Sequence, residues 1–145
     1  MKKSPLILLL FICFNSFIIN SKAPLINKVN PLIGTQKNIG DTGAINYPVI
    51  GLPFGMNLWT PQTFNKEGLI YNYADTKITG FRQTHQLNSE QKDYGAFALM
   101  PMGDTLITNT ENRAADFNHL SEKAYPYHYR VRMYNGITCE IAPTD

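Results

Sequence analysis

A series of short β-prone runs, each ended by turn-forming residues, limits the fold more than any other feature of this chain. The runs are rich in Val, Ile, Thr, Tyr and Phe, and clusters of Gly, Pro, Asn and Asp separate them. Only one stretch, residues 114–124, has even a weak helical period. We therefore predict an all-β fold, most simply an antiparallel β-sandwich. The predicted strands are residues 29–33, 47–52, 55–60, 69–73, 78–84, 96–102, 127–133 and 137–142.

The last two predicted strands form a hairpin whose register can be chosen from the side chains. A two-residue loop would pair Arg132 with Cys139 and so mix charged and apolar groups on one face. A three-residue loop with Gly136 in the left-handed bulge position instead places all the apolar side chains on the core face. We predict this second register. Its pairs are Met133–Ile137, Val131–Cys139, Tyr129–Ile141 and, on the solvent face, Arg130–Glu140.

The first 23 residues have the features of a secretory signal peptide. Residues 1–3 carry two lysines, residues 6–14 are almost purely apolar, and residues 21–23 supply the small side chains of a cleavage site. Asn15 interrupts the apolar run well before the roughly 18 residues that a membrane-spanning helix requires. We expect an exported protein, periplasmic or secreted, with no stable membrane span and a mature chain that begins near residue 24.

The charge balance does not favour a nucleic-acid partner. The formal net charge is +2, but Lys2, Lys3 and Lys22 belong to the predicted signal peptide. The remaining residues carry 10 basic and 11 acidic side chains. We therefore expect no nucleic-acid binding. A mature chain of this length has enough residues for one hydrophobic core, and we expect one domain or part of one.

Several familiar catalytic and metal-binding patterns are present only in weak form. Residues 41–44 read Asp-Thr-Gly-Ala, as in aspartic proteases, but the apolar strand that should precede them is missing, so a turn is the better prediction. His85, His119 and His128 lack the spacing of zinc ligands. Cys139 is the single cysteine after the predicted signal peptide, and its place in an apolar alternation predicts a small core residue.

The remaining functional signal is an inventory of aromatic and amide side chains. Aromatic rings stack on the C–H faces of sugars and planar amides bind sugar hydroxyls, although an ordinary sandwich core needs the same aromatic residues. His85 stands out because it ends a predicted strand and opens a polar loop, which is where sandwiches place binding residues. The inventory consists of Trp59, Tyr71, Tyr73, Phe81 and Tyr94 with Asn57, Gln62, Asn72, Gln83, Gln86 and Asn88.

Short motifs in a fixed order cover nearly all of residues 29–145. They read VNPLIGT at 29–35, LPFGM at 52–56, WTPQT at 59–63, ITGFRQTHQ at 78–86, DYG at 93–95, LMPM at 99–102 and IAPT at 141–144, with Phe117, His119, Glu122, Ala124, Pro126 and Tyr129 spaced between the last two. In this order the motifs resemble the N-terminal domain of glycoside hydrolase family 92. The members of this family are exported bacterial α-mannosidases.

The resemblance implies a two-domain enzyme in which a β-sandwich packs on a larger (α/α)6 barrel. Such enzymes remove terminal α-mannose with inversion and with the help of a calcium ion, and the barrel supplies both the catalytic carboxylates and the calcium ligands. Residues 24–145 are then expected to be an N-terminal β-sandwich domain that is incomplete at its C-terminal end and inactive alone. The implied partners are a mannose-containing glycan and the missing catalytic domain.

The resemblance implies one turn that contributes to substrate binding, and the polar loop after residue 84 is a second candidate because of its place after a strand. Phe54 and Gly55 lie on a turn that resembles the family segment approaching the terminal sugar, where a glycine lets the backbone come close to a hydroxyl; an ordinary tight turn is the alternative. His85, Gln86 and Asp93 border the polar loop after the strand predicted at 78–84. This loop and the segment before residue 71 depart from the family pattern, which leaves the linkage preference open.

Two other functions stay open on the residues alone. One is a non-catalytic carbohydrate-binding module. The other is an inert truncated remnant with an exposed apolar face.

Overall fold

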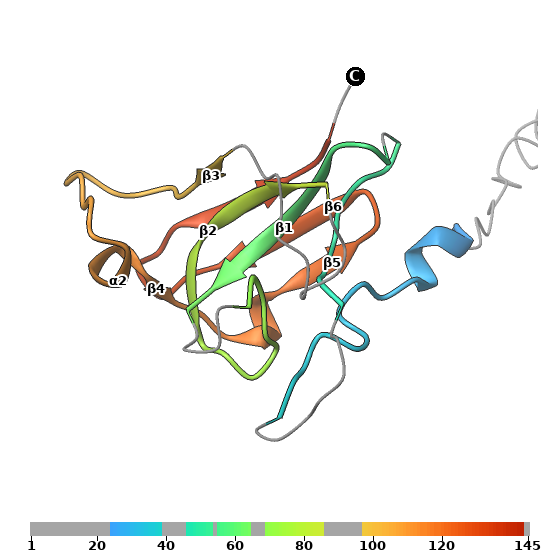
Figure 1. Ribbon diagram of the computed structural model, residues 1–145, viewed down its shortest axis with the longest axis horizontal. Coiled ribbons are helices and arrows are strands. Elements are labelled where there is room, and N and C mark those ends of the chain that lie inside the picture. Colours follow the sequence, from blue (N-terminus) through green and yellow to red (C-terminus); the bar gives the residue numbers. More distant parts are fainter. Residues whose placement is uncertain (1–23, 39–45, 54, 65–68, 86–96, 144–145) are drawn as a thin grey trace, which may run out of the picture.

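The computed structural model describes residues 24–38, 46–53, 55–64, 69–85 and 97–143, and antiparallel strands dominate it (Figure 1). One sheet has the order β1-β2-β3, and β4 also pairs with β2; the other has the order β5-β6-β7. The strands are β1 (Leu58–Thr63), β2 (Lys77–Thr84), β3 (Ala98–Leu99), β4 (Ala115–Asp116), β5 (Lys123–Tyr125), β6 (His128–Arg132) and β7 (Thr138–Ile141). Three single-turn helices accompany them: η1 (Leu25–Lys28), α2 (Thr110–Arg113) and η2 (His119–Ser121).

The core lies between the two sheets, and β2 and β6 supply most of it. Ile78 and Phe81 of β2 and Tyr129 and Val131 of β6 are all at most 2% exposed. The rings of Phe81 and Tyr129 lie 6.1 Å apart, so the two layers meet directly. Figure 1 shows β1 and β2 lying over β5 and β6. The predicted all-β sandwich is confirmed.

The predicted register of the C-terminal hairpin is also confirmed. Val131 pairs with Cys139 and Arg130 with Glu140, and the Arg130 Nε lies 3.2 Å from a Glu140 carboxylate oxygen. Gly136 has a φ of +88°, a value that favours glycine, and its N–H donates to the Met133 carbonyl at 3.0 Å. The burial alternation of β6, in which every second residue is buried, follows from this register.

Two predicted strands are wrong because side chains and turns satisfy their backbone groups. Within the stretch predicted at 29–33, the Asn30 side chain accepts the Leu32 N–H at 3.0 Å and a turn follows, ending at Gly34 with a φ of +76°. The stretch predicted at 69–73 is irregular. Its Asn72 N–H donates to the Thr63 hydroxyl at 3.0 Å rather than to a strand.

Other predicted boundaries shift, and the weak helix is absent. The stretch predicted as a strand at 47–52 contributes only an isolated bridge from Ile50 to Trp59. Residues 114–124 contain β4, η2 and the first part of β5 instead of one helix. The side chain of Asn118 accepts the Leu120 N–H at 2.8 Å and so starts a 3-10 turn, which local polar bonding favours over a longer helix. In the described part of the chain, no helix is long and apolar enough to cross a membrane.

Candidate functional site

The turn that carries Gly55 lies in a loop that is closed by two backbone hydrogen bonds at the start of β1. Ile50 and Trp59 exchange two backbone hydrogen bonds, both 2.8 Å long. The chain between them forms a loop whose two ends are thereby held together. This arrangement fixes where the loop leaves the sandwich.

The first half of this loop is bound to the second sheet. The N–H groups of Gly51 and Leu52 both donate to the carbonyl of Pro126, at 3.0 and 3.1 Å. Pro126 lies in the turn between β5 and β6. The loop therefore rests on both layers of the sandwich.

The second half of the loop is bound to the end of β2 through His85. The Nδ1 of His85 lies 2.9 Å from the carbonyl oxygen of Met56. Because a carbonyl oxygen only accepts, Nδ1 carries the hydrogen, and the ring Nε2 is left to accept from the Gln83 amide at 3.1 Å. The structure thus brings His85 to the residue that follows Gly55, two predicted site positions that lie 30 residues apart in the sequence.

Gly55 faces open space. A Cβ built on it would meet no atom within 4 Å. Its φ lies outside the left-handed region, which among the described glycines is occupied by Gly34 and Gly136. Neither backbone conformation nor packing within the described residues demands a glycine here. The position is accessible to an external group.

Phe54, Gln86 and Asp93, the other predicted site residues, lie outside the described residues.

An apolar groove of about 830 Å³ opens beside this loop between the two sheets. The Trp59 ring forms one wall and packs edge-on against Phe97, with ring centroids 5.4 Å apart. Few polar groups face the groove, so it offers little to sugar hydroxyls. Its lining residues are Asn57, Trp59, Phe81, Leu99, Met100, Pro101, Cys139, Glu140, Ile141, Ala142 and Pro143.

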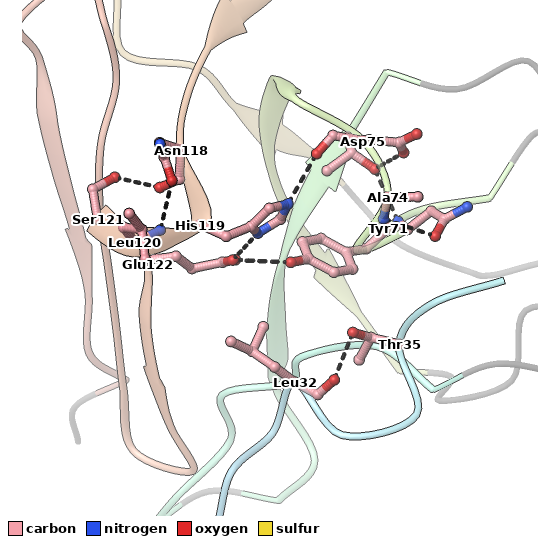
Figure 2. A network of polar contacts seen from close by, with 12 residues as sticks. Leu32, Thr35, Tyr71, Ala74, Asp75, Asn118, His119, Leu120, Ser121 and Glu122 are labelled. Carbon is pink, nitrogen blue, oxygen red and sulfur yellow. Dashed lines mark hydrogen bonds and ion pairs between the residues drawn. The ribbon is translucent and has the colours of Figure 1, made fainter. Parts of the chain in front are cut away.

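A buried polar network surrounds Glu122, and Figure 2 shows the part of it that includes Tyr71, Asp75 and His119. The Glu122 carboxylate accepts from the Tyr129 hydroxyl at 2.6 Å and from the Tyr71 hydroxyl at 3.0 Å. The Nδ1 of His119 lies 2.6 Å from its second oxygen. Three groups therefore compensate one carboxylate whose side chain has no exposure.

The protons of this network can be placed from the chemistry of its acceptors. The Nε2 of His119 lies 3.0 Å from the carbonyl of Asp75, so Nε2 carries a hydrogen. The His119 ring is also stacked on Tyr73, with centroids 4.0 Å apart. Burial, and secondarily the charge of Glu122, raise the pKa of the Tyr71 and Tyr129 hydroxyls well above the usual range. Both phenols therefore stay protonated as donors.

This network pins an irregular segment to the second sheet rather than forming a reaction centre. It joins residues 71–75, which belong to no strand, to η2 and β6. His119 and Glu122 belong to the spaced motif at residues 117–129, which by itself predicts no role for either side chain. Their spacing of three residues was the available signal; nothing in the sequence linked them to Tyr71, which lies 51 residues from Glu122.

Among the residues that the structure describes, no three His, Cys, Asp or Glu side chains are grouped to hold a metal ion. The described residues therefore contain no cluster of three carboxylates for the calcium ion that the resemblance implies.

Comparisons with known proteins agree with this architecture. The structure of the inverting mannosidase BT2199 of family GH92 from Bacteroides thetaiotaomicron VPI-5482 is 40% identical over 82% of this chain, with a TM-score of 0.72, and the match covers 16% of that chain. The α-mannosidase BT3965 from Bacteroides thetaiotaomicron is 25% identical, with a TM-score of 0.66, and the match covers 83% of this chain and 17% of that one. No curated protein matches the chain significantly. Residues 28–145 match the glycosyl hydrolase family 92 N-terminal domain, and the chain therefore belongs to this family.

Proposed function

We propose that this chain is the N-terminal part of an exported α-mannosidase that releases terminal mannose with inversion. The observation that carries the proposal is the 40% identity, over 82% of the chain, to a structure described as an inverting mannosidase. Because the chain spans 16% of that structure, hydrolysis is proposed for the whole protein. The described domain alone is expected to be inactive.

The proposed division of labour follows from the chemistry of inversion. An inverting glycosidase needs a general acid and a general base about 6.5–9.5 Å apart, with room for a water molecule between them. Glu122 cannot serve, because its side chain is buried and already accepts from Tyr71 and Tyr129. As the resemblance to the family implies, both catalytic carboxylates are proposed to come from the separate (α/α)6 domain.

The sandwich is proposed to contribute to the sugar pocket through its two loops. Gly55 supports this role because its backbone is open to an external group. The loop that carries it is bound to Pro126 at one end and to His85 at the other, so its position is set before a sugar arrives. The proposed contributors to the substrate site, by direct contact or by positioning the loops, are Phe54, Gly55, His85, Gln86 and Asp93.

Calcium and export belong to the same proposal. As the resemblance implies, the ion is proposed to be held by the catalytic domain and to supply positive charge near the sugar there. The predicted signal peptide at residues 1–23 supports export to the periplasm or the medium. A carboxyl-terminal tag on the intact gene product should be recovered outside the cytoplasm, and deletion of residues 2–22 should retain it inside.

The activity is tested on the intact gene product with an aryl α-mannoside. Inversion predicts that proton NMR shows β-mannose as the first product, because the bond that is broken has the α configuration. A chelator should abolish the release, and added calcium should restore it. The matched aryl β-mannoside and the chain of residues 24–145 should give no release. Initial formation of α-mannose, or activity that survives calcium removal, would contradict the proposal.

A further inference from the structure

We infer that His85 is a positioning residue for the Gly55 turn, acting through the carbonyl of Met56 rather than through direct contact between its imidazole and the sugar. The inference rests on the proposed function, because it specifies how the mannose-facing turn is held.

The ring of His85 is already used within the protein. Its Nδ1–H donates to the Met56 carbonyl at 2.9 Å, and its Nε2 lies 3.1 Å from the Gln83 amide nitrogen. Direct binding of a sugar hydroxyl by either nitrogen would require one of these hydrogen bonds to be given up. The geometry therefore favours a role in holding the turn.

The contact is placed where it controls the turn. Met56 follows Gly55, and its carbonyl belongs to the Met56–Asn57 peptide, so a bond at this oxygen fixes the chain one peptide beyond the open glycine. The other end of the loop is fixed independently by the Pro126 carbonyl, which accepts from Gly51 and Leu52 at 3.0 and 3.1 Å. Gly55 therefore lies between two points of the loop that are held by hydrogen bonds. Loss of the His85 bond would leave the loop held by the Pro126 contacts and the Ile50–Trp59 bonds, but no longer held at Met56.

The chemistry of the contact also predicts which substitution replaces it. An asparagine carries its Nδ2 one bond from Cγ, the same place that Nδ1 occupies in histidine, so His85→Asn can donate to Met56. His85→Gln carries a similar amide one bond too far out, and His85→Ala carries no donor. Because His85 is exposed, none of the three substitutions removes a core side chain.

The first measurement is NMR on the chain itself. In His85→Ala, the Met56 carbonyl ¹³C resonance should move upfield and the Gly55 amide should exchange with solvent several-fold faster, while the melting temperature changes little. His85→Asn should restore both signals, and His85→Gln should not. An unmoved Met56 resonance in His85→Ala would overturn the inference.

The second measurement is kinetics of the intact gene product on the same aryl α-mannoside. His85→Ala should lower kcat/KM by about tenfold, the loss expected of one positioning hydrogen bond. His85→Asn should recover most of it. If His85→Asn restores the Met56 resonance but not kcat/KM, the imidazole itself contacts the sugar and the inference fails. If the unsubstituted protein does not act on α-mannosides, the proposed function fails, and the NMR result still decides whether His85 positions the turn.

Discussion

Glu122 Oε2 and His119 Nδ1 lie 2.6 Å apart, and this short contact is the centre of the network that holds an irregular segment against the second sheet. The two residues are three positions apart. One partner, Tyr129, lies seven residues after Glu122, whereas Tyr71 and Asp75 lie 51 and 44 residues from their partners in the pair. The pair is a buried acceptor surrounded by donors. Removing its charge should therefore cost far more than removing an exposed one.

Glu122→Gln tests this expectation. The amide replaces one acceptor oxygen with a donor that faces another donor, so the free energy of unfolding should fall by about 3 kcal/mol. Urea unfolding followed by circular dichroism measures it. Glu140→Gln is the matched control, because Glu140, like Glu122, lies beside a histidine but is half-exposed and also pairs with Arg130. This substitution should lower the free energy of unfolding by less than about 1 kcal/mol. Equal losses for the two variants would show that burial of Glu122 is unimportant.

The tyrosine donors to Glu122 provide a second prediction. Tyr129→Phe should lower the free energy of unfolding by about 2 kcal/mol, because its 2.6 Å bond goes to a buried charged acceptor. Tyr71→Phe, which removes a 3.0 Å bond, should cost less. Tyr134→Phe is the control, since its side chain is 71% exposed. A Tyr129→Phe variant as stable as the control would contradict the assigned geometry.

The raised pKa values of these two hydroxyls predict a loss of stability in alkali. An unfolded tyrosine ionises near its ordinary pKa of 10.0, whereas folded Tyr71 and Tyr129 stay protonated. The native state then binds more protons than the unfolded state, so stability is complete below about pH 10 and falls above it. Melting temperatures from pH 8 to 11 measure this fall. The double variant with Phe at both positions should show a shallower slope, and an unchanged slope would refute the assignment.

Cys139 should contribute a separate loss of stability that begins at lower pH than the loss from the two tyrosines. Burial, and then the charge of Glu140, raise the pKa of its thiol from 9.0 to about 11. The unfolded thiol ionises first, so its contribution to stability is present below pH 9 and is lost between about pH 9 and 11. The native thiol should react slowly with an aromatic disulfide at pH 8, and urea should speed the reaction. Cys139→Ala should remove this part of the pH profile and leave the tyrosine part. Fast labelling of the native protein would contradict the raised pKa.

The parts of this fold that could be predicted are those whose side chains define one register or one motif. The hairpin was predictable because a single shift of β7 would place Arg132 opposite Cys139 on the core face. The irregular path of residues 69–73 was not, since it depends on single bonds such as that from Asn72 N–H to Thr63, which a strand-like composition does not reveal. The contact between His85 and Met56 was equally hidden, because it joins two loops whose approach is set by the whole sandwich.

Gly55 provides the last test, because substitution there should change mannoside binding without changing the free energy of unfolding. Gly55→Ala should leave the free energy of unfolding unchanged within about 0.5 kcal/mol, since its Cβ meets nothing within 4 Å and its φ is not left-handed. Gly136→Ala is the control and should cost about 1–2 kcal/mol, because its φ of +88° disfavours a side chain. In the intact gene product, Gly55→Ala should weaken mannoside binding at least tenfold, measured as KM and as competition by methyl α-mannoside. The added methyl group meets open space in the protein alone, so such a loss would locate the sugar at this turn. A stable variant with normal binding would instead make Gly55 part of an ordinary tight turn.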